Sequence, residues 1–306
     1  MGKIDVIIPL YNDESNIGRC LESICRQTIA EKIRIIIVDD GSTDNSVQVA
    51  KDTLEKQGML DKAEIICLPE NRGVANARRK GAEAITGEYF LYCDSDDYMD
   101  LDMCEKLLDK AESDGCDMVV CDYKSIHGDD VKAIHNCYRD DFLRQLILCN
   151  VTGSLCNKLV KSSLIKDSGF RFPVHDFSED YVYSLQFAIR AKNIGYVPEP
   201  LYNYDHRAGS QVQAQSAEKR RKIYVDDMVN FKLDLEILEH EGLLEKYRGE
   251  IIAHKLKMKN SNNENLKMWR KTFPELSYEV FTSRYVSIRS RMAYFVRLIG
   301  LYKNLK

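Results

Sequence analysis

The chain has 306 residues and a net charge of −4, but residues 251–306 carry twelve Lys and Arg against three Glu, which leaves an acidic body and a basic tail. This length allows one main domain with an appended segment, and no apolar run approaches the ~20 residues that would span a bilayer. The ten cysteines include no C-x-x-C pair and no secretory signal opens the sequence, so we expect reduced thiols in a cytoplasmic protein.

Short apolar runs alternate with amphipathic stretches along the first 125 residues, which predicts strands that alternate with helices. Right-handed crossovers between such strands would give a mainly parallel sheet flanked by helices, an α/β fold. We expect strands at 4–8, 33–38, 63–68, 89–93 and 118–122, and helices at 14–27, 43–56, 74–85 and 101–113.

The pattern is looser after residue 125. From residue 216 onward the sequence is predicted to be helical, with a break at 260–265. We therefore predict a main domain over residues 1–215 and a helical C-terminal extension over residues 216–306. Between these parts we expect a strand at 131–135, helices at 140–149 and 179–191, a Lys-rich element at 154–168 and a loop at 169–176.

The run from Phe90 to Asp97 carries the strongest chemical signal, because an apolar strand leads into three carboxylates within four positions. Side chains alternate along a strand, so we expect Asp94 and Asp96 to point the same way. Hard oxygen ligands favour Mg²⁺ or Mn²⁺, and two carboxylates leave room for a substrate diphosphate. One of the three, Asp97, could instead cap the helix that follows.

Polar residues follow four of the five predicted strands, and ligands bind beyond the carboxyl ends of such strands. In the pair Asp39-Asp40, a carboxylate at the strand end can accept the N3–H of a uracil ring. Arg72 and Arg78 lie around the start of the predicted helix at 74–85, next to the expected diphosphate site. The alternative is that both arginines are simply solvated.

Four motifs occur in register: PLYN at the first strand, VDDGSTDNS after the second, NRGVANARRKG after the third and YCDSDD after the fourth. Their order and spacing over residues 3–210 resemble those of family 2 glycosyltransferases, which have the GT-A fold. The resemblance implies an enzyme of the bacterial surface-polysaccharide type. Residues 1–125 would form its nucleotide-binding half and residues 126–215 its acceptor half.

The resemblance also implies roles for individual residues. Asp96 would hold a divalent metal, Mn²⁺ or Mg²⁺, that bridges the diphosphate. Residues 202–210 resemble the loop that closes over the diphosphate, and relatives often have a basic residue where Asp205 stands. The cationic contact would then fall to Arg207 or His206, and His206 is also a candidate metal ligand. The other expected contacts to the nucleotide sugar are Pro9, Tyr11 and Asp39 at the base, Asp94 at the ribose and Arg78 near the diphosphate or sugar.

The segment 177–181 resembles the Glu-Asp motif of the family, which makes Asp180 the expected catalytic base. An ordinary explanation exists too, because acidic residues favour helix N-termini through the helix dipole. The motif at 156–159 resembles an Asn-Lys-Leu motif near the acceptor pocket. A single base on the face opposite the leaving group implies one displacement, and therefore inversion of the anomeric configuration.

We expect the donor to be a UDP-sugar, with a hexosyl or N-acetylhexosaminyl group, and the acceptor to be a hydroxyl of a glycan or lipid-linked glycan. Apolar and basic residues near the C-terminus predict an amphipathic helix on the anionic inner face of the cell membrane. Packing of that helix on the body or on a second subunit of a homo-oligomer is the alternative. No nucleic-acid recognition motif accompanies the basic tail, so we expect no nucleic-acid partner.

Two other functions stay open. The chain could be a catalytically inactive, sugar-nucleotide-binding partner of a glycosyltransferase complex, although such a protein would not need both Asp96 and Asp180. It could also be a sugar-nucleotide nucleotidyltransferase, but such enzymes usually have a glycine-rich phosphate loop after the first strand. Here that position holds residues 10–14, which are acidic and lack glycine.

Overall fold

The computed structural model describes residues 2–136, 138, 141–206, 216–261, 272–274, 276 and 279–298. The chain divides into two compact units, one of residues 1–139 and 152–233 and the other of residues 140–151 and 234–306. The domain boundary predicted between residues 215 and 216 borders an undescribed segment, 207–215, and stays a prediction.

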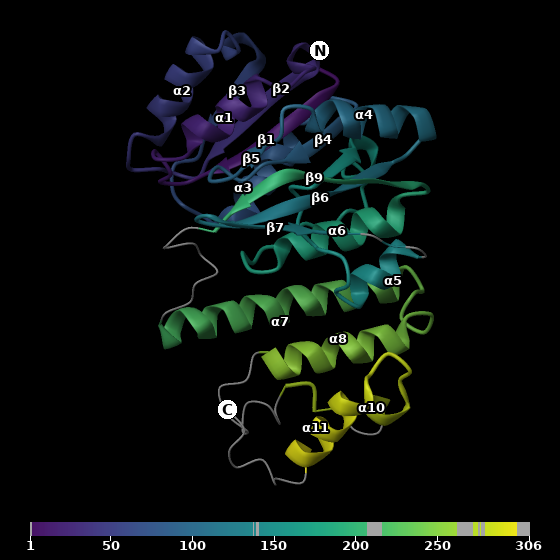
Figure 1. Ribbon diagram of the computed structural model, residues 1–306. Coiled ribbons are helices and arrows are strands. Elements are labelled where there is room, and N and C mark those ends of the chain that lie inside the picture. The colour runs from purple at the N-terminus through teal and green to yellow at the C-terminus, as the bar shows by residue number, and fades with distance from the viewer. Residues whose placement is uncertain are drawn as a thin grey trace. The chain divides into compact units, whose positions relative to one another are not determined.

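The described strands of the first unit form one nine-stranded sheet, in the order β3-β2-β1-β4-β8-β6-β9-β5, with β7 paired to β6 (Figure 1). The half from β3 to β4 is parallel throughout, and antiparallel pairs enter with β8, β7 and β5. The strands are β1 Ile4–Leu10, β2 Ile33–Asp39, β3 Ala63–Cys67, β4 Tyr89–Tyr92, β5 Tyr98–Met99, β6 Met118–His127, β7 Asp130–Ile134, β8 Lys158–Lys161 and β9 Ile194–Asp205.

Helices cover both faces of this sheet. Right-handed crossovers put α1 and α2 on one face and α3 on the other, because the chain turns back across the sheet after β3. Figure 1 shows α4 and α6 on opposite sides of β6 and β9. The expected mainly parallel sheet flanked by helices is therefore confirmed. The helices are α1 Ile17–Cys25, α2 Ser46–Lys56, α3 Val74–Glu83, α4 Met103–Asp114, α6 Glu179–Arg190 and the first part of α7, Ala217–His240.

The core sits between the central strands and the helices. Every residue of β1 is buried, which accounts for its nearly continuous aliphatic sequence. Helix α3 packs so closely on this strand that a Cβ at Gly81 would overlap the side chain of Ile7. On the same face, α6 sets Phe187 against Phe90 of β4, with ring centroids 5.8 Å apart.

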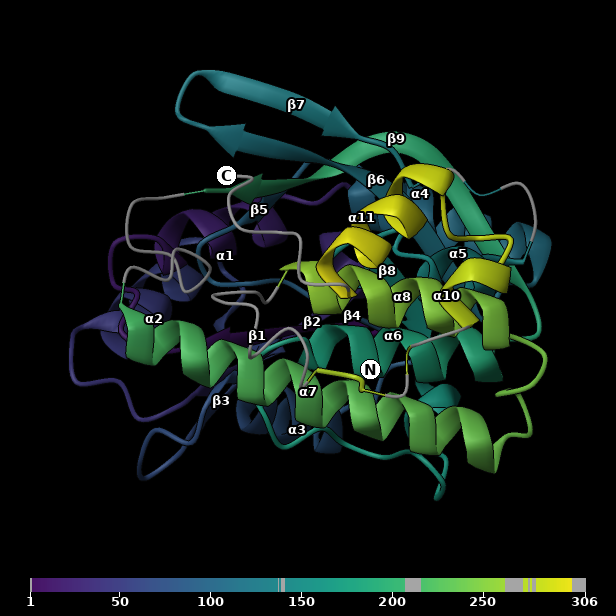
Figure 2. The same cartoon turned by 90° about the horizontal axis from the view of Figure 1, so that it is seen from below.

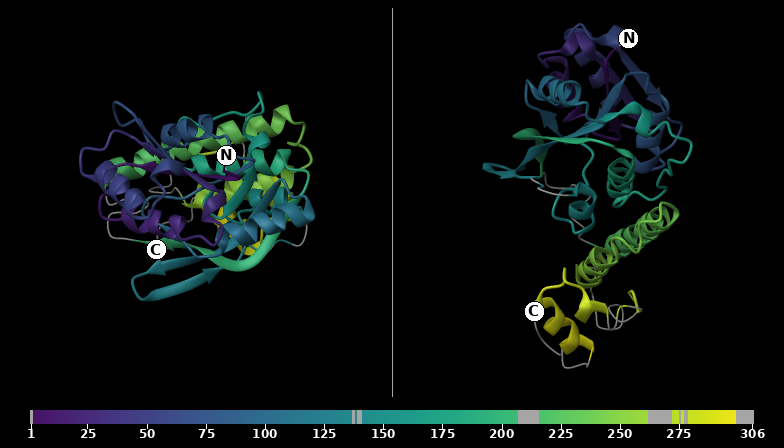
Figure 3. Two further views of the ribbon diagram at one scale, coloured as in Figure 1. Left: turned by 90° about the horizontal axis from the view of Figure 1, so that it is seen from above. Right: turned by 90° about the vertical axis from the view of Figure 1, so that its right-hand side faces the viewer.

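Strand β9 was not predicted, and residues 202–205 belong to it rather than to a loop. The strand was missed because of Pro198 and Pro200. Proline has no N–H to donate to a neighbouring strand, and it normally argues against an internal strand. The structure accommodates them at an irregularity, where the register with β6 shifts between Cys121 and Tyr123. Figure 2 shows β9 beside β6, and β6 with β7 forms a long hairpin that extends from its neighbours in both views of Figure 3.

Other predicted elements differ in extent. The element expected at 154–168 is the short strand β8 followed by one 3-10 turn, Ser162–Leu164. The helix expected at 140–149 is α5, Phe142–Ile147, which belongs to the second unit. Part of the break expected at 260–265 lies outside the described residues.

The second unit is helical, with α5 and α10, Glu279–Thr282, packed on α8, Arg248–Ser261. The buried carboxylate of Glu250 accepts a hydrogen bond from Arg144 Nε at 2.9 Å. In α11, Ile288–Leu298, Tyr294 is buried, whereas Ile288, Met292 and Phe295 are 75%, 65% and 50% exposed. None of the helices in the described part of the chain is long and apolar enough to cross a membrane.

Candidate active site

The site lies where β1 and β4 are neighbours, because the strand order reverses there: from β1 the chain continues to β2 on one side, and from β4 it continues to strands on the other side. Such a switch point opens a crevice at the carboxyl ends of the strands. The loops that follow β1 and β4 meet there, and Ser95 Oγ donates a hydrogen bond to Asp13 Oδ2 at 2.7 Å. The predicted acidic run therefore borders this crevice.

Residues 94–97 form a turn rather than an extended strand, because the Asp97 amide donates to the Asp94 carbonyl at 3.1 Å. The expectation that strand alternation aligns Asp94 with Asp96 is therefore wrong. Asp97 is also not a helix cap, since α4 begins at Met103. It is buried and accepts hydrogen bonds from the Tyr202 hydroxyl at 2.6 Å and from the Asp205 amide at 2.9 Å, which ties the turn to β9.

Arg78 of α3 is a buried cation of the site, with only 6% of its surface exposed. Its Nη2 donates to Asp94 Oδ1 at 2.7 Å and its Nη1 to Glu179 Oε1. Burial alone would lower the pKa of Arg78, but the two carboxylates raise it well above its usual value. The Arg78 Nε is buried and has no hydrogen-bond partner among the described residues.

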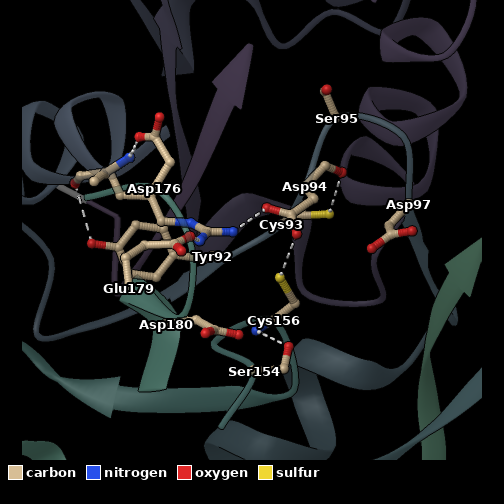
Figure 4. Close-up of polar contacts among 12 residues, drawn as sticks. Tyr92, Cys93, Asp94, Ser95, Asp97, Ser154, Cys156, Asp176, Glu179 and Asp180 are labelled. Carbon is tan, nitrogen blue, oxygen red and sulfur yellow. Dashed lines mark hydrogen bonds and ion pairs between the residues drawn. The ribbon is translucent and has the colours of Figure 1, made fainter. Parts of the chain in front are cut away.

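The opposite oxygen of Asp94 accepts a hydrogen bond from the thiol of Cys156 at 3.4 Å. Asp94 is therefore held from two sides, by α3 and by the segment before β8. Figure 4 shows Asp94, Cys156, Glu179 and Asp180 in one group. The structure thus brings together residues from four separate predicted motifs.

Asp180 lies in the first turn of α6, directly after Glu179. Burial raises the pKa of Asp180, and the positive charges of Arg78 and Lys158 only partly oppose that effect. Burial likewise raises the pKa of Glu179. The residue Asp180 keeps part of its surface exposed, which leaves it accessible to a substrate.

Lys158 is fully buried behind Asp180, and burial lowers the pKa of its ammonium group to about 8. Its Nζ donates to the carbonyl oxygens of Thr152 and Ser154 and to Asn157 Oδ1 at 3.0 Å. The lysine therefore fixes the loop at 152–154, which packs against α6 through a 2.6 Å hydrogen bond from Ser184 Oγ to the carbonyl of Gly153.

The expected base-binding residues lie at the ends of β1 and β2. Pro9 is buried within β1, and Tyr11 follows the strand with 44% of its surface exposed. Asp39 is buried and accepts a hydrogen bond from the Ser42 amide at 3.1 Å. Its neighbour Asp40 has a separate role, because its carboxylate accepts the amides of residues 72 and 73 at the start of α3.

Comparison with known proteins identifies the chain. Residues 5–159 match the family model described as Glycosyl transferase family 2. The chain belongs to this family. The protein EpsH of Bacillus subtilis (strain 168) is 30% identical over 259 residues, which cover 81% of this chain and 72% of EpsH. Two further curated bacterial glycosyltransferases are longer, and the chain spans 31% and 32% of their lengths.

Solved structures give the same fold. Residues 1–349 of S. aureus TarS, in complex with UDP-GlcNAc, match with a TM-score of 0.65 at 20% identity, covering 99% of this chain and 94% of that one. The mannosyltransferase PcManGT of Pyrobaculum calidifontis, in complex with GDP-Man and Mn²⁺, matches with a TM-score of 0.56 at 16% identity, covering 98% and 81%. This family 2 glycosyltransferase therefore has the GT-A fold.

Two residues of the glycosyltransferase site were not predicted. Arg19 of α1 donates to Asp205 Oδ2 at 2.8 Å and to the carbonyl of Asp96 at 2.6 Å, so it joins the acidic turn to the end of β9. Asp176 accepts a hydrogen bond from the Ala75 amide at 3.3 Å, at the start of α3. No local pattern marks either residue, because each acts on a segment far away in the sequence.

The structure places the two predicted metal ligands, Asp96 and His206, in different surroundings. Asp96 lies in the acidic turn, whereas His206 Nε2 is 2.9 Å from Ser125 Oγ and its ring stacks on His127. Arg207 lies outside the described residues. Within the described ranges, no group of three or more His, Cys, Asp or Glu side chains could hold a metal ion alone.

The charge of the acidic turn fits a cation shared with a substrate. Burial, together with the charges of Asp94 and Asp96, raises the pKa of Asp97 to about 8. Burial is the larger of these causes, and the repulsion among the three carboxylates of the turn is what a divalent cation would offset. Carboxylate oxygens suit Mg²⁺ or Mn²⁺, and such ions commonly complete their coordination with substrate phosphates. The residues present therefore fit a divalent metal ion that takes further ligands from outside the protein.

Proposed function

We propose that this glycosyltransferase moves a sugar from a nucleotide-diphosphate sugar, with UDP as the expected nucleotide, to a hydroxyl of a glycan or lipid-linked glycan, with inversion. The proposal rests on one observation: Asp180 lies in one group with the buried Arg78–Asp94 ion pair at the switch point between β1 and β4. Burial raises the pKa of the Asp180 carboxyl group. The complexes of TarS with UDP-GlcNAc and of PcManGT with GDP-Man support a nucleotide-sugar donor.

On the donor side, Tyr11 offers an exposed ring on which a base can stack, and Pro9 and Asp39 would complete the base pocket. Asp94 would contact the ribose. Arg78 would contact the diphosphate or donor sugar, because its buried Nε has no acceptor among the described residues and an unpaired buried donor is costly. Arg207 would add a further cation.

Asp96 would hold Mn²⁺ or Mg²⁺, with His206 as a second candidate ligand. When bound, the metal supplies a positive charge that stabilises the departing nucleoside diphosphate. The Mn²⁺ in the PcManGT complex supports this assignment. The protein itself contributes Arg19, which holds the carbonyl of Asp96 and thereby the position of the turn.

Asp180 would take the proton from the acceptor hydroxyl while that oxygen attacks the anomeric carbon. A carboxylate whose pKa is raised holds a proton more firmly and is therefore a better base than an ordinary aspartate. Lys158 and the loop at 152–154 would shape the acceptor side. With one base opposite the leaving group, the reaction is a single displacement.

The C-terminal extension would bring the enzyme to a lipid-linked acceptor on the cytoplasmic face of a membrane. Ile288, Met292 and Phe295 of α11 are spaced four and three residues apart, so they lie on one exposed face of the helix. After Glu279 the sequence contains Arg and Lys but no acidic residue. An apolar stripe with basic neighbours fits an anionic lipid surface.

The test is the release of nucleoside diphosphate from a panel of UDP-, GDP- and dTDP-sugars, each with Mn²⁺, with Mg²⁺ and with EDTA. We expect slow release from one donor, at a rate that EDTA and Asp96→Ala abolish. Turnover of no donor in the presence of metal would contradict the proposal and favour an inactive binding partner. Formation of a nucleotide sugar from a sugar phosphate and a nucleoside triphosphate would favour a nucleotidyltransferase.

A further inference from the structure

The segment at 175–178, directly before Glu179 and Asp180, has an unusual backbone. It has no regular secondary structure, and Ser178 has φ 61° and ψ 20°, in the left-handed region. Residues other than glycine rarely adopt this conformation, and they keep it only when surrounding contacts hold it. Ser178 also occupies the N-cap position of α6, so its conformation sets the direction in which the helix starts.

The first half of α7 supplies the contacts that hold this segment. Ser178 Oγ donates to Asp227 Oδ1 at 2.8 Å. Asn230 is 1% exposed, and its Nδ2 donates to the carbonyl of His175 at 3.0 Å and to the carbonyl of Phe177 at 2.7 Å. The buried side-chain amide of Asn230 therefore links the two backbone carbonyls that flank Asp176.

Two ion pairs extend this contact along the helix. His175 Nδ1 lies 3.0 Å from Asp226 Oδ1, and Lys222 Nζ lies 3.5 Å from Asp176 Oδ2. Lys222, Asp226 and Asn230 are spaced by four residues, so they share one face of α7. Asp176, held in this way, also accepts the Ala75 amide of α3, the helix that carries Arg78.

We propose that this face of α7, centred on Asn230 and Asp227, positions the catalytic base. It fixes the left-handed turn at Ser178, and the turn fixes Glu179 and Asp180 at the start of α6. Asn230 and Asp227 are positioning residues, because they act through the segment at 175–178 without touching substrate. The inference rests on the proposed role of Asp180.

The main test compares Asn230→Ala with Val229→Ala, a change on the same helix at a residue that is 40% exposed. We expect Asn230→Ala to lower kcat for nucleotide release about tenfold or more, because small displacements of a catalytic group are costly. KM for the donor and the affinity for UDP should stay within about twofold, since the nucleotide contacts are elsewhere. Val229→Ala should behave as wild type.

A second variant separates positioning from simple loss of structure. In the Asn230→Ala background, Ser178→Gly should restore part of kcat, because glycine adopts the left-handed conformation without strain. Ser178→Ala keeps the strained left-handed backbone and removes only the hydrogen bond from the hydroxyl group to Asp227. This variant should lower kcat and leave KM for the donor unchanged. This milder variant provides the test if Asn230→Ala does not fold.

Unchanged kcat in Asn230→Ala and Ser178→Ala, or an equal loss of kcat and UDP affinity, would overturn the inference. Asp180→Asn, measured in parallel, separates this failure from a failure of the proposed function. If Asp180→Asn is inactive while the α7 variants are unaffected, only the positioning role is wrong. If Asp180→Asn keeps wild-type turnover, the base assignment itself is wrong.

Discussion

At the scale of single residues, two carboxylates of the site share the buried guanidinium group of Arg78. Arg78 is bonded to both Asp94 and Glu179, so the guanidinium compensates two carboxylates and leaves Asp180 without a hydrogen bond to it in the structure. Charged groups in such surroundings interact strongly, because little water screens them. Of these neighbouring acids, Asp180 is the one that we propose exchanges a proton with a substrate.

Asp180→Asn should lower kcat by about 10²–10⁴-fold, because the amide cannot accept the proton of the acceptor. In the wild type, activity requires the deprotonated carboxylate, so the rate should rise with pH through the pKa of Asp180. Burial raises that pKa, and the acidic limb of kcat should therefore lie above the ordinary range of aspartate. A rate profile with no such limb, together with an active Asp180→Asn enzyme, would exclude this base. The measurement is kcat for nucleotide release between about pH 4 and 9.

At the scale of elements, the start of α3 is set by two carboxylates from distant loops. Asp40 accepts the Gly73 amide at 2.7 Å and Asp176 accepts the Ala75 amide. Acidic groups at a helix N-terminus pair with its free amides and with the positive end of its dipole. Since α3 carries Arg78, these two loops place the cation of the active site.

Gly73→Ala should disturb this arrangement. Gly73 has φ 93°, and a Cβ there would overlap the carboxylate of Asp176. We expect a loss of about 1–3 kcal/mol in the free energy of unfolding from the backbone alone, with a further loss from the displaced carboxylate. Gly115→Ala is the matched control, because Gly115 has φ 64° and a methyl group there would meet no atom of the described residues within 4 Å. Equal losses for both variants in urea unfolding would contradict the role given to Asp176.

The elements that could be predicted are those whose own sequence marks them. Strands β1, β2 and β4 are marked by continuous apolar runs. The motif after β4 located Asp94, the motif after β3 located Arg78, and the motif at 177–181 located Asp180. The resemblance was confirmed by the match to Glycosyl transferase family 2, whereas the roles of these residues stay predictions. Strand β9 was missed because its prolines mask a ladder that tolerates them at a register shift.

The contacts that complete the site could not be predicted from the sequence for a different reason. Arg19 and Asp176 act over 77 and 101 residues of sequence, and nothing in their neighbourhood distinguishes them from surface charges. The turn at 94–97 likewise depends on β9, because Asp97 is held by Tyr202 and Asp205. These positions depend on contacts between residues that are far apart in the chain, and such contacts cannot be read from a single sequence.

At the scale of the whole molecule, the charge is polarised along the sequence, and α11 combines exposed apolar residues with arginines. We expect the protein to sediment with vesicles that contain anionic lipid and not with neutral vesicles. Phe295→Asp should weaken this binding, since it puts a charge on the apolar stripe, while Leu60→Asp, at another exposed apolar residue, should not. Wild-type binding by Phe295→Asp would exclude α11 as the contact, and self-association through α11 would appear as a change in sedimentation without vesicles.

The most direct test of the account is a calorimetric titration of the protein with UDP, with Mn²⁺ and with EDTA. The account predicts binding in Mn²⁺ that EDTA or Asp96→Asn weakens at least about tenfold, and that Asp180→Asn leaves unchanged. Absence of UDP binding in Mn²⁺, or an equal loss in Asp180→Asn, would contradict a nucleotide-diphosphate site between β1 and β4 with a separate catalytic base.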